Sequence, residues 1–465
     1  MKAAFHTLGC KVNQYETEAI KEQFKGAGYE IGAEEDPADV YIINTCTVTN
    51  LADRKSRQYI RRMKKQNPEA IVVVTGCYAQ VNPEEVASLP EVDIVTGTGE
   101  KGRIIEYVQE FLDNKEKQKH ILSYSELTGY SDEGIITSMD SRTRAYIKIQ
   151  EGCDRFCSYC LIPFARGPVR SRDPKSIVSE AETLISKCFK ELVLTGINTA
   201  LYGREDGFSI ERFEGEKKMD PMEIVIKRLN ELEGEFRIRL SSLEPTVIDS
   251  DYVKKLLKYD RLCHHLHLSI QSGSDNVISA MNRNYTRSEY LDIVKELKAF
   301  DPHYGISTDI ICGFPGETDE DFADSLSMVR EAGFCKVHAF NFSPRKGTAA
   351  YEMDGQVSSE TKNFRVSELI REGETVANEF LDGLRNEERK VIFEEVTGEI
   401  GETDGFSPEE ENAGKKVLTG YTDNYVKVYA VGDLEDLNKI LPVKLLEKYR
   451  DGMKGEILCQ TVYFA

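Results

Sequence analysis

Residues 145–160 read AYIKIQEGCDRFCSYC, an apolar stretch that runs directly into three closely spaced cysteines. We interpret Ala145–Gln150 as a β-strand, and Cys153, Cys157 and Cys160 as metal ligands in the loop that follows it. A structural zinc site and an electron-transfer 4Fe–4S cluster both use four ligands, and no fourth ligand lies nearby in the sequence. Three cysteines on a 4Fe–4S cluster leave one iron open to a substrate or cofactor. The spacing predicts a catalytic iron–sulfur cluster, with a zinc or electron-transfer site as the alternative.

Five more apolar runs alternate with helical patterns after this first strand. They are Glu191–Thr195, Phe236–Ser241, His265–Ile270, Gly305–Ile311 and Lys336–Phe342. Six βα units of this kind predict a full or partial (βα)6 barrel whose functional site lies at the C-terminal ends of the strands. Polar or glycine-rich segments close four of these runs, namely TGIN, SSLEP, QSGS and TDIICGFPGE.

The N-terminal segment also alternates strand and helix patterns. We predict strands at Ala3–Thr7, Val40–Asn44, Ala70–Thr75 and Ile94–Val95, with helices at Tyr15–Gly26 and Leu51–Lys65. This alternation indicates a parallel sheet with helices on its faces, in which ligands collect beyond the C-terminal ends of the strands. Cys10, Cys46 and Cys77 each follow one of these strands. We therefore expect the three cysteines to share one site; three unrelated buried cysteines are the alternative.

The C-terminal segment changes character. After an amphipathic stretch at Glu360–Asn386, short alternating runs bounded by glycine occur at Lys390–Val396, Lys416–Thr422, Tyr425–Ala430, Leu441–Leu446 and Ile457–Tyr463. They predict a small all-β barrel. The fold class is α/β, and we divide the chain into an N-terminal domain at 1–125, a linker at 126–142, a barrel domain at 143–388 and a β-barrel at 389–465.

Composition limits the classes of protein that remain. The chain has 465 residues, and one domain per ~150 residues predicts about three domains. It contains no apolar run of ~18 residues and no secretory signal pattern, so we expect no membrane partner and a cytoplasmic location. Eleven cysteines, an odd number in a chain without export signals, argue against a disulfide framework. The net charge of −20 argues against a simple electrostatic nucleic-acid binder.

The cysteine spacing directly after the first strand of a βα barrel resembles the radical S-adenosylmethionine (SAM) superfamily. The resemblance implies that the open iron binds the amino and carboxylate groups of SAM, and that electron transfer then releases a 5′-deoxyadenosyl radical. It also places candidate SAM contacts at the strand ends and in MNRNYT. These candidates are Thr195, Gly196, Asn198, Ser242, Glu244, Gln271, Arg283 and Asp309.

The whole chain resembles the methylthiotransferase family of radical SAM enzymes. The sequence motifs that carry this resemblance are TLGCKVNQYETE, NTCTVTN, TGCYAQ, EGCDRFCSYCLIP, HLHLSIQSGSD, DIICGFPGE and FSPRKGT. It implies that Cys10, Cys46 and Cys77 hold a second 4Fe–4S cluster with an open iron, which presents the sulfur to be inserted. Two SAM molecules would be used per turnover, one for the methyl group and one for the radical. The last domain would be a TRAM-like RNA-binding barrel.

Three branches of that family differ in substrate. The sequence around Cys10, Cys46 and Ser269-Ile270 is similar to that of the branch that modifies carbon 2 of N6-threonylcarbamoyladenosine beside the tRNA anticodon. The alternatives are the same chemistry on isopentenyl-type adenosine, whose branch typically reads YGCQMN and LPVQSGS, or on a ribosomal-protein aspartate. A non-catalytic iron–sulfur protein that binds RNA or transfers electrons is the rival from another class.

The implied partners are the tRNA anticodon stem-loop, an electron donor such as flavodoxin or ferredoxin, and a sulfur donor. The segment Leu51–Lys65 carries seven Lys/Arg and one Asp, and a basic helical face there would contact the RNA backbone, although a solvated face is the alternative. Residues 390–465 carry more acidic than basic side chains, which favours stacking contacts in the last domain. The RNA-binding candidates are Arg54, Arg57, Arg61, Lys64, Tyr421 and Tyr425. We interpret His264, His265 and His267 as structural residues.

Overall fold

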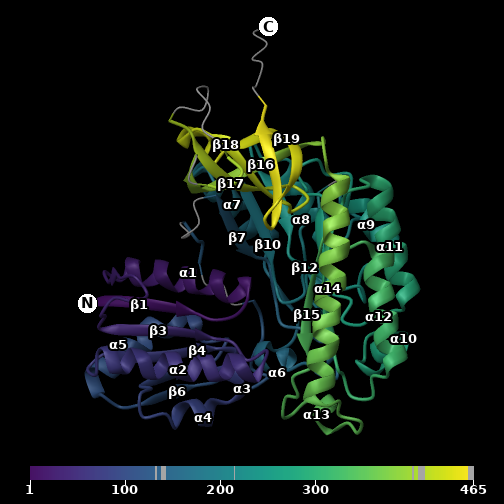
Figure 1. Ribbon diagram of the computed structural model, residues 1–465. Helices are drawn as coiled ribbons and strands as arrows, with labels where there is room; N and C mark the ends of the chain where they lie inside the picture. Colours follow the sequence, from purple (N-terminus) through teal and green to yellow (C-terminus); the bar gives the residue numbers. More distant parts are fainter. Residues whose placement is uncertain (131–133, 138–142, 214, 401–402, 407–413, 459–465) are drawn as a thin grey trace.

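The computed structural model describes residues 1–130, 134–137, 143–213, 215–400, 403–406 and 414–458 (Figure 1). An N-terminal α/β layer lies beside a central α/β barrel, and a small β-barrel sits at one end of the central barrel. The linker predicted at 126–142 falls partly outside the described residues. Among the described helices, none combines the length and the apolar character needed to cross a bilayer.

The N-terminal sheet has six parallel strands in the order β2-β1-β3-β4-β5-β6. Its strands are β1 Lys2–Thr7, β2 Glu30–Ile31, β3 Val40–Thr45, β4 Ile71–Gly76, β5 Ile94–Thr96 and β6 Gln118–His120. Its helices are α1 Lys11–Gly26, α2 Asn50–Gln66, α3 Cys77–Val81, α4 Pro83–Ala87, η1 Lys101–Arg103 and α5 Ile104–Asn114. The four predicted strands are present, and the short edge strands β2 and β6 escaped prediction because they hold only two or three residues each. Both faces of the sheet are buried, Val72 and Val74 in one core and Ile71 and Val73 in the other, so its central strands lack alternation.

The central domain forms a six-stranded parallel wall. Its strands are β7 Arg144–Lys148, β10 Glu191–Thr195, β11 Arg237–Leu240 with its continuation β12 Ser242–Leu243, β13 His265–Leu268, β14 Gly305–Cys312 and β15 Lys336–Asn341. They pair in the order β7-β10-β11 and β12-β13-β14-β15, and a bridge between Ile238 and Leu262 joins the two groups. Neither β7 nor β15 pairs with a further described strand on its outer side, so the predicted barrel is an open one.

Helices cover the outer face of this wall. They are α7 Pro174–Ser186, α8 Pro221–Asn230, α9 Ser250–Leu256, α11 Arg287–Phe300, α12 Asp319–Ala332 and α14 Ser359–Gly383. Shorter elements are β8 Gln150–Glu151, α6 Ile162–Arg166, β9 Arg170–Ser171, η2 Thr199–Leu201, α10 Asp275–Ala280 and α13 Ala349–Glu352. One apolar core extends from Ala145 to Val376 between helices and strands. Because this apolar core lies between the strands and the helices, the side chains on the inner face of the strands can be polar.

The C-terminal segment closes into a five-stranded barrel in the order β16-β17-β18-β20-β19. Its elements are β16 Glu388–Glu399, β17 Lys416–Thr422, β18 Lys427–Gly432, η4 Leu434–Asp436, β19 Ile440–Tyr449 and β20 Gly452–Ile457. Most of the strand predicted at Ile457–Tyr463 lies outside the described residues, which end at 458, and Ile457 is the last residue of β20. A Cβ on Gly452 would lie 2.1 Å from the Lys427 carbonyl oxygen, so the close approach of β20 to β18 requires glycine at this position. In the sequence, such a glycine indicates a turn rather than a strand.

The β17–β18 hairpin covers the N-terminal end of the central strands. Arg237, on β11, donates to the Tyr421 carbonyl at 3.1 Å, and Arg239 donates to the Asp423 carbonyl at 3.0 Å. The Asn424 side chain donates to the His303 carbonyl at 2.9 Å. The hairpin therefore covers the end of the central barrel opposite the strand ends that carry the cysteine loop (Figure 1).

We expect the Gly152→Ala variant to be strongly destabilised. Gly152 precedes Cys153, has φ +75°, and an added Cβ would lie 1.8 Å from the Pro168 carbonyl oxygen. The backbone must shift, at a cost of about 3 kcal/mol or more. Gly26→Ala is the matched control: nothing lies within 4 Å of the position that its Cβ would take, and alanine in α1 should stabilise by about 0.5–1 kcal/mol. Thermal melting measures both, and equal melting temperatures for the two variants would contradict this account.

Candidate functional site: two cysteine trios joined by a buried ion network

Cys10, Cys46 and Cys77 come together at one edge of the N-terminal sheet. Cys10 is the N-cap residue of α1, Cys46 follows β3, and Cys77 opens α3 directly after β4. Strands β1, β3 and β4 are parallel neighbours, so their C-terminal ends lie side by side. A Cβ on Gly9 would lie 2.9 Å from Cys46 Cβ, which shows how closely the first two loops approach. The shared location is what the sequence predicted.

The environment of these thiols suits metal-bound sulfur. The pKa of Cys46 is raised to about 12, mainly by burial and also by the nearby thiol of Cys77. Burial also raises the pKa of Cys77, which the nearby Arg166 guanidinium opposes. Without a ligand the thiols are protonated, and a bound iron–sulfur cluster displaces those protons.

Cys153, Cys157 and Cys160 form a second trio at the C-terminal end of β7 and β8. The loop is held by the Cys153 amide, which donates to the Gly167 carbonyl at 3.1 Å, and by the Cys160 amide, which donates to the Cys157 carbonyl at 2.9 Å. Burial raises the pKa of Cys153 to about 12, and the neighbouring Cys157 adds to it. Phe156 lies beside the ring of Phe164, with centroids 5.9 Å apart, and forms an aromatic rim over the loop.

The spacing of the sulfurs argues against a single bound ion. In the part of the chain that the structure describes, neither trio brings all three sulfurs within 4.8 Å of one another. Thiolates around one zinc lie closer together, because each Zn–S bond is only about 2.3 Å. The wider spacing fits cysteines that ligate separate irons of a cluster. A zinc ion would require the sulfurs of a trio to move closer together.

The strand ends beside the second trio present unsatisfied polar groups. The Thr195 hydroxyl and both polar atoms of the Asn198 side chain are buried and have no hydrogen-bond partner among the described residues. A Cβ on Gly196 would lie 2.9 Å from the Gln150 side-chain oxygen, so the glycine keeps the chain close to the cysteine loop. Buried polar groups without partners cost free energy unless a ligand satisfies them. Thr195, Gly196 and Asn198 thus fit an amino-acid moiety such as that of SAM.

Two other predicted SAM contacts meet in one ion pair. Arg283 is buried, pairs with Glu244, and donates to the Tyr159 hydroxyl at 3.0 Å. Tyr159 stands between Cys157 and Cys160, so this ion pair braces the cysteine loop. Gln271, which follows β13 with φ +68°, is bridged to Ile310 of β14, and its backbone amide donates to the Asp309 carbonyl at 2.9 Å. The Ser242 carbonyl accepts from the Thr199 hydroxyl at 2.8 Å.

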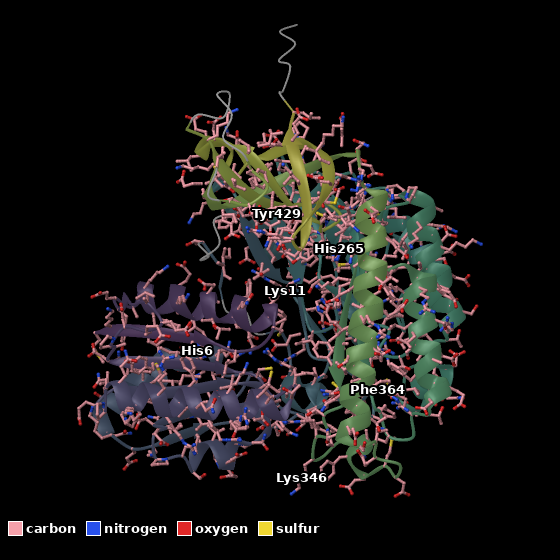
Figure 2. All side chains as sticks on the ribbon, viewed as in Figure 1. His6, Lys11, His265, Lys346, Phe364 and Tyr429 are labelled. Carbon is pink, nitrogen blue, oxygen red and sulfur yellow. The ribbon has the colours of Figure 1, made fainter. Side chains whose placement is uncertain are left out.

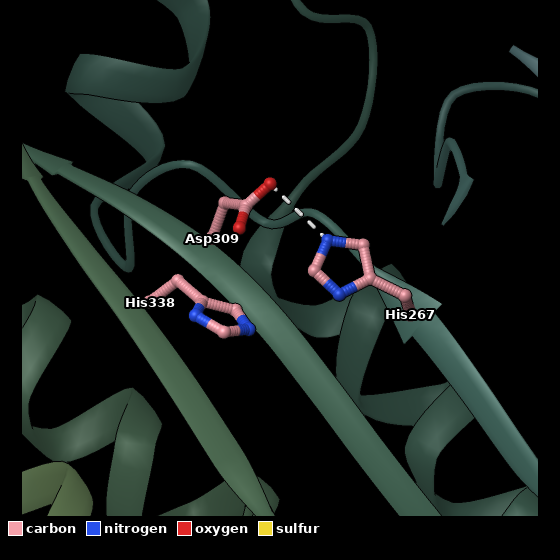
Figure 3. A group of neighbouring side chains, drawn as sticks. All are labelled: His267, Asp309 and His338. Carbon is pink, nitrogen blue, oxygen red and sulfur yellow. Dashed lines mark hydrogen bonds and ion pairs between the residues drawn. The ribbon is translucent and has the colours of Figure 1, made fainter. Parts of the chain in front are cut away.

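Asp309 lies in a polar cluster on the inner wall of the barrel. His267 lies 3.1 Å from the Asp309 carboxylate, as does the Ser269 hydroxyl, and His338 faces them from β15 (Figure 3). Burial opposes ionisation of Asp309, but His267 holds its pKa below the usual value. The interpretation of His267 as a structural residue stays a prediction, and the structure adds its contact with Asp309. HLHLS alternates polar side chains along one face of a strand, which places His267 and Ser269 on the same face.

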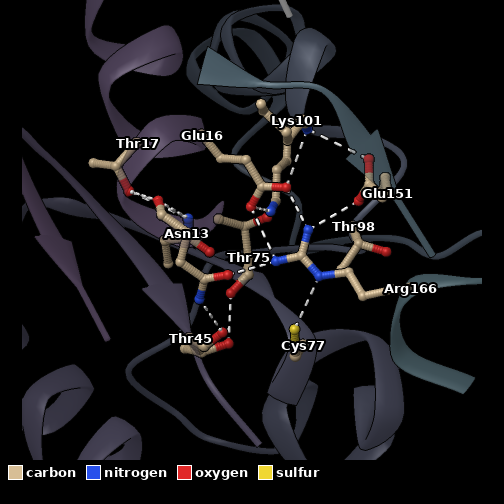
Figure 4. Close-up of polar contacts among 12 residues, drawn as sticks. Asn13, Glu16, Thr17, Thr45, Thr75, Cys77, Thr98, Lys101, Glu151 and Arg166 are labelled. Carbon is tan, nitrogen blue, oxygen red and sulfur yellow. Dashed lines mark hydrogen bonds and ion pairs between the residues drawn. The ribbon is translucent and has the colours of Figure 1, made fainter. Parts of the chain in front are cut away.

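A buried ion network connects the two trios. Arg166, at the end of α6, donates to Cys77 Sγ at 3.1 Å, pairs with Glu16 of α1, and donates to Glu151 at 2.9 Å (Figure 4). Lys101 and Lys148 also pair with Glu16. The five charged residues of this network are at most 1 % exposed. Sequence analysis missed this network because its members are far apart in the chain.

The comparisons with known proteins agree with this geometry. Residues 2–97 match the family described as "Uncharacterized protein family UPF0004", and residues 147–329 match the radical SAM superfamily. The chain is 41 % identical to "Threonylcarbamoyladenosine tRNA methylthiotransferase MtaB" of Bacillus subtilis (strain 168), over 96 % of this chain and 93 % of that protein.

This chain belongs to the methylthiotransferase family of radical SAM enzymes. It is also 33 % identical to "tRNA-2-methylthio-N(6)-dimethylallyladenosine synthase" of Clostridium novyi (strain NT), over 97 % of this chain and 95 % of that protein. Among solved structures, the radical SAM methyltransferase TsrM from Kitasatospora setae superposes with a TM-score of 0.53 at 13 % identity, covering 73 % of this chain and 72 % of that one. That likeness shows the shared fold.

The basic helix predicted to contact RNA is α2 of this methylthiotransferase. Arg57 donates to the Tyr78 hydroxyl at 2.8 Å and pairs with Glu85 at 2.9 Å. Lys64 pairs with Asp93 at 2.9 Å, and Arg61 lies 4.0 Å from Glu91. Arg54 is exposed. The four side chains do not form one free basic face, and their contact with RNA stays a prediction.

The two tyrosines predicted to stack on RNA lie in the β17–β18 hairpin, which covers the N-terminal end of the central strands. Tyr421 and Tyr425 stack on each other with centroids 5.2 Å apart. The guanidinium of Arg144 lies 4.5 Å from the Tyr421 ring centre, and that of Arg239 lies 4.7 Å from the Tyr425 ring centre. An RNA base would have to displace these cations to stack there. The two rings therefore join the barrels in this structure, and their contact with RNA stays a prediction.

We expect Arg166→Met to destabilise the fold by about 3–5 kcal/mol, because it leaves Glu16 and Glu151 buried without their main partner. Arg166→Lys keeps a positive charge but cannot reach both carboxylates and Cys77 as the guanidinium does. We expect the lysine variant to fold and to lose iron from the N-terminal trio. Thermal melting and iron content per chain measure these effects. A methionine variant as stable as the wild type would contradict the role given to the network.

Proposed function

We propose that this enzyme places a methylthio group on carbon 2 of N6-threonylcarbamoyladenosine beside the anticodon of tRNA. The observation that carries the proposal is the pairing of two three-cysteine sites across one buried interface, in a chain that matches methylthiotransferases over nearly its full length. The relative with the same substrate class in its name is 41 % identical, and the dimethylallyl-type relative is 33 % identical. The isopentenyl, ribosomal-protein and non-catalytic alternatives are not favoured.

When bound, two 4Fe–4S clusters and SAM supply the radical, the sulfur and the methyl group. Cys153, Cys157 and Cys160 would hold the cluster that binds SAM, and Cys10, Cys46 and Cys77 would hold the cluster that presents sulfur. Two SAM molecules are expected per product, one for the methyl group and one for the radical.

The strand ends bind and orient SAM in this proposal. Thr195 and Asn198 have the unsatisfied polar atoms needed for its amino-acid groups, and Gly196 allows their close approach. Asp309, oriented by His267 and Ser269, is placed to accept from a ribose hydroxyl. The Glu244–Arg283 pair holds Tyr159 and thereby the cysteine loop. Ser242 and Gln271 complete the proposed set at neighbouring strand ends.

The partners follow from the reaction. The tRNA anticodon stem-loop must approach the gap between the two trios, with its target base out of the stack. A reductant such as flavodoxin or ferredoxin and a separate sulfur donor are proposed because the reaction consumes electrons and sulfur. The proposed compartment is the cytoplasm, because the substrate is tRNA. The division into 1–125, 126–142, 143–388 and 389–465 remains our proposed domain scheme.

The two trios should have separable functions. We expect Cys157→Ala to abolish reductive cleavage of SAM, because it removes a ligand of the SAM-binding cluster. Cys46→Ala should leave that cleavage and stop formation of the methylthio product, since it affects only the second trio. Chromatographic detection of 5′-deoxyadenosine alongside the RNA product measures both steps. Equal loss of SAM cleavage in the two variants would contradict the assignment.

The substrate is tested by mass spectrometry of nucleosides from tRNA of cells with and without the gene. The expected result is the methylthio form of threonylcarbamoyladenosine only in cells that have the gene. Cys188→Ala is the matched control variant for complementation, because Cys188 is an exposed cysteine outside both trios. Appearance of the dimethylallyl product instead would move the enzyme to the other branch, and no change in either nucleoside would exclude both substrates.

A further inference from the structure

The inner face of β15 carries three exposed side chains in a row, those of Lys336, His338 and Phe340. They alternate with Val337 and Ala339, which pack into the apolar core on the side of α14. Alternate residues of a strand share one face, and His338 belongs to the polar cluster of the inner wall, so all three line the inside of the barrel. Because β15 is the last strand of the open wall, this face is accessible from outside.

Phe340 is an aromatic side chain without an aromatic partner. It is 48 % exposed, whereas Phe342, the next residue on the same face, is buried and packs against Phe314 with ring centroids 5.5 Å apart. In the described part of the chain, no ring stacks on Phe340 and no cation lies over it. The apolar core that contains Phe342 thus ends before Phe340 and leaves its ring half exposed.

The surroundings of Phe340 connect to both cysteine trios. Its partner on β14 is Ile311, which packs on the same small core as Tyr159 of the second trio. The chain that follows β15 brings Arg345 to the Thr47 hydroxyl at 2.7 Å, beside the first trio. Phe340 therefore lies on the part of the wall that borders both trios.

The proposed SAM site is adjacent on the same wall. His338 lies opposite Asp309, the proposed contact of the SAM ribose, and Phe340 is the next residue along the same face. A base that stacks on Phe340 is consequently placed beside the bound SAM, where the radical forms in the proposed function. The wall thus offers an aromatic surface at the point that the target base must reach.

A cavity of about 480 Å³ continues from this face towards the C-terminal barrel. Lys336 and His338 line it from β15, and Lys427 and Arg450 line it from the C-terminal barrel. Its lining holds three Lys/Arg side chains and two carboxylates. Lys336 makes no ion pair with any described residue, and Lys427 pairs with Asp451 at 3.2 Å. The cavity wall is therefore positive on balance, which suits a phosphate group.

We propose that the inner face of β15 binds the single-stranded RNA segment that carries the target base. Phe340 stacks on the target adenine, and Lys336, at the edge of the cavity, contacts a neighbouring phosphate. An aromatic platform beside a positive groove is the arrangement that proteins use for single-stranded nucleic acid. At a rise of ~3.3 Å per residue, the two side chains are ~13 Å apart along β15, a distance that a short extended stretch of RNA spans. The inference rests on the proposed function, which requires the base to leave its stack.

The test separates the stack from the rest of the RNA contact. Two anticodon stem-loops, one with threonylcarbamoyladenosine and one with an abasic nucleotide at that position, are titrated with the cluster-loaded enzyme without SAM. We expect Phe340→Leu to bind the complete stem-loop about 10- to 100-fold more weakly than the wild type, because leucine has no aromatic face. It should bind the abasic stem-loop with wild-type affinity. Phe340→Tyr keeps the aromatic face and should keep both affinities.

Phe364→Leu is the matched control. Phe364 is an exposed aromatic residue on the outer helix α14, so its loss should leave both affinities unchanged (Figure 2). Iron content and melting temperature of each variant show whether it is folded and loaded with clusters. Phe340→Tyr keeps the test decisive if the leucine variant is not.

The phosphate contact is tested by its salt dependence. Lys336→Gln should weaken the binding of both stem-loops equally and reduce the slope of log affinity against log salt concentration by about 0.7. Lys254→Gln is the control for this change, because Lys254 pairs with Glu296 at 3.2 Å on the outer helices. Its salt slope should equal that of the wild type.

Three results would overturn the binding surface. They are a Phe340→Leu variant that binds the complete stem-loop as the wild type does, an equal loss of affinity for the complete and abasic stem-loops in that variant, and an unchanged salt slope in Lys336→Gln. A wild type that modifies dimethylallyladenosine RNA but not threonylcarbamoyladenosine RNA would instead refute the proposed function, and the binding surface with it. The first three outcomes leave product formation by the wild type intact, so the two failures are distinguishable.

Discussion

The buried guanidinium of Arg166 is the contact on which the arrangement of this enzyme depends. It touches Cys77 of one trio, lies on the helix that follows Cys160 of the other, and is neutralised by Glu16 and Glu151 from two different domains. Such a network contributes little net stability, because removing charges from water is costly. Its geometry is nevertheless specific, since a misaligned interface would leave several charges buried without partners. Its main consequence is that the two cysteine sites are held in fixed positions relative to each other.

A second tether acts on the other side of the N-terminal trio. Arg345, which follows β15, pairs with Asp53 at 2.6 Å and donates to the Thr47 hydroxyl at 2.7 Å, next to Cys46. Helix α3, which begins at Cys77, also packs against α6. The trio is thus held from both edges of the open barrel wall. Two sites that must act on one carbon atom need this kind of preorganisation, because small displacements of reacting groups carry large rate penalties.

The parts of the fold that depend on local pattern could be predicted from the sequence, and those that depend on distant contacts could not. The six cysteines follow apolar strands in the sequence, so their positions at strand ends were predictable. Glu16 and Arg166 are 150 positions apart, and no periodicity relates them. Strand β20 was missed because close packing against Lys427 requires glycine, which normally signals a turn. Tyr421 and Tyr425 were predicted to stack on RNA, but their contacts with Arg144 and Arg239 could not be predicted, because these arginines lie far away in the sequence.

Net charge says little about the interior of this enzyme, because its buried charges are arranged by local contacts. The chain carries −20 overall, yet the Glu191 carboxylate pairs with two buried guanidinium groups, those of Arg237 and Arg239. The C-terminal barrel orients Arg237 and Arg239 with backbone carbonyls of Tyr421, Thr422 and Asp423. Carbonyl dipoles satisfy the guanidinium donors without cancelling their charge. The same contacts join the C-terminal barrel to the central strands, because a shift between them would leave guanidinium donors buried and without partners.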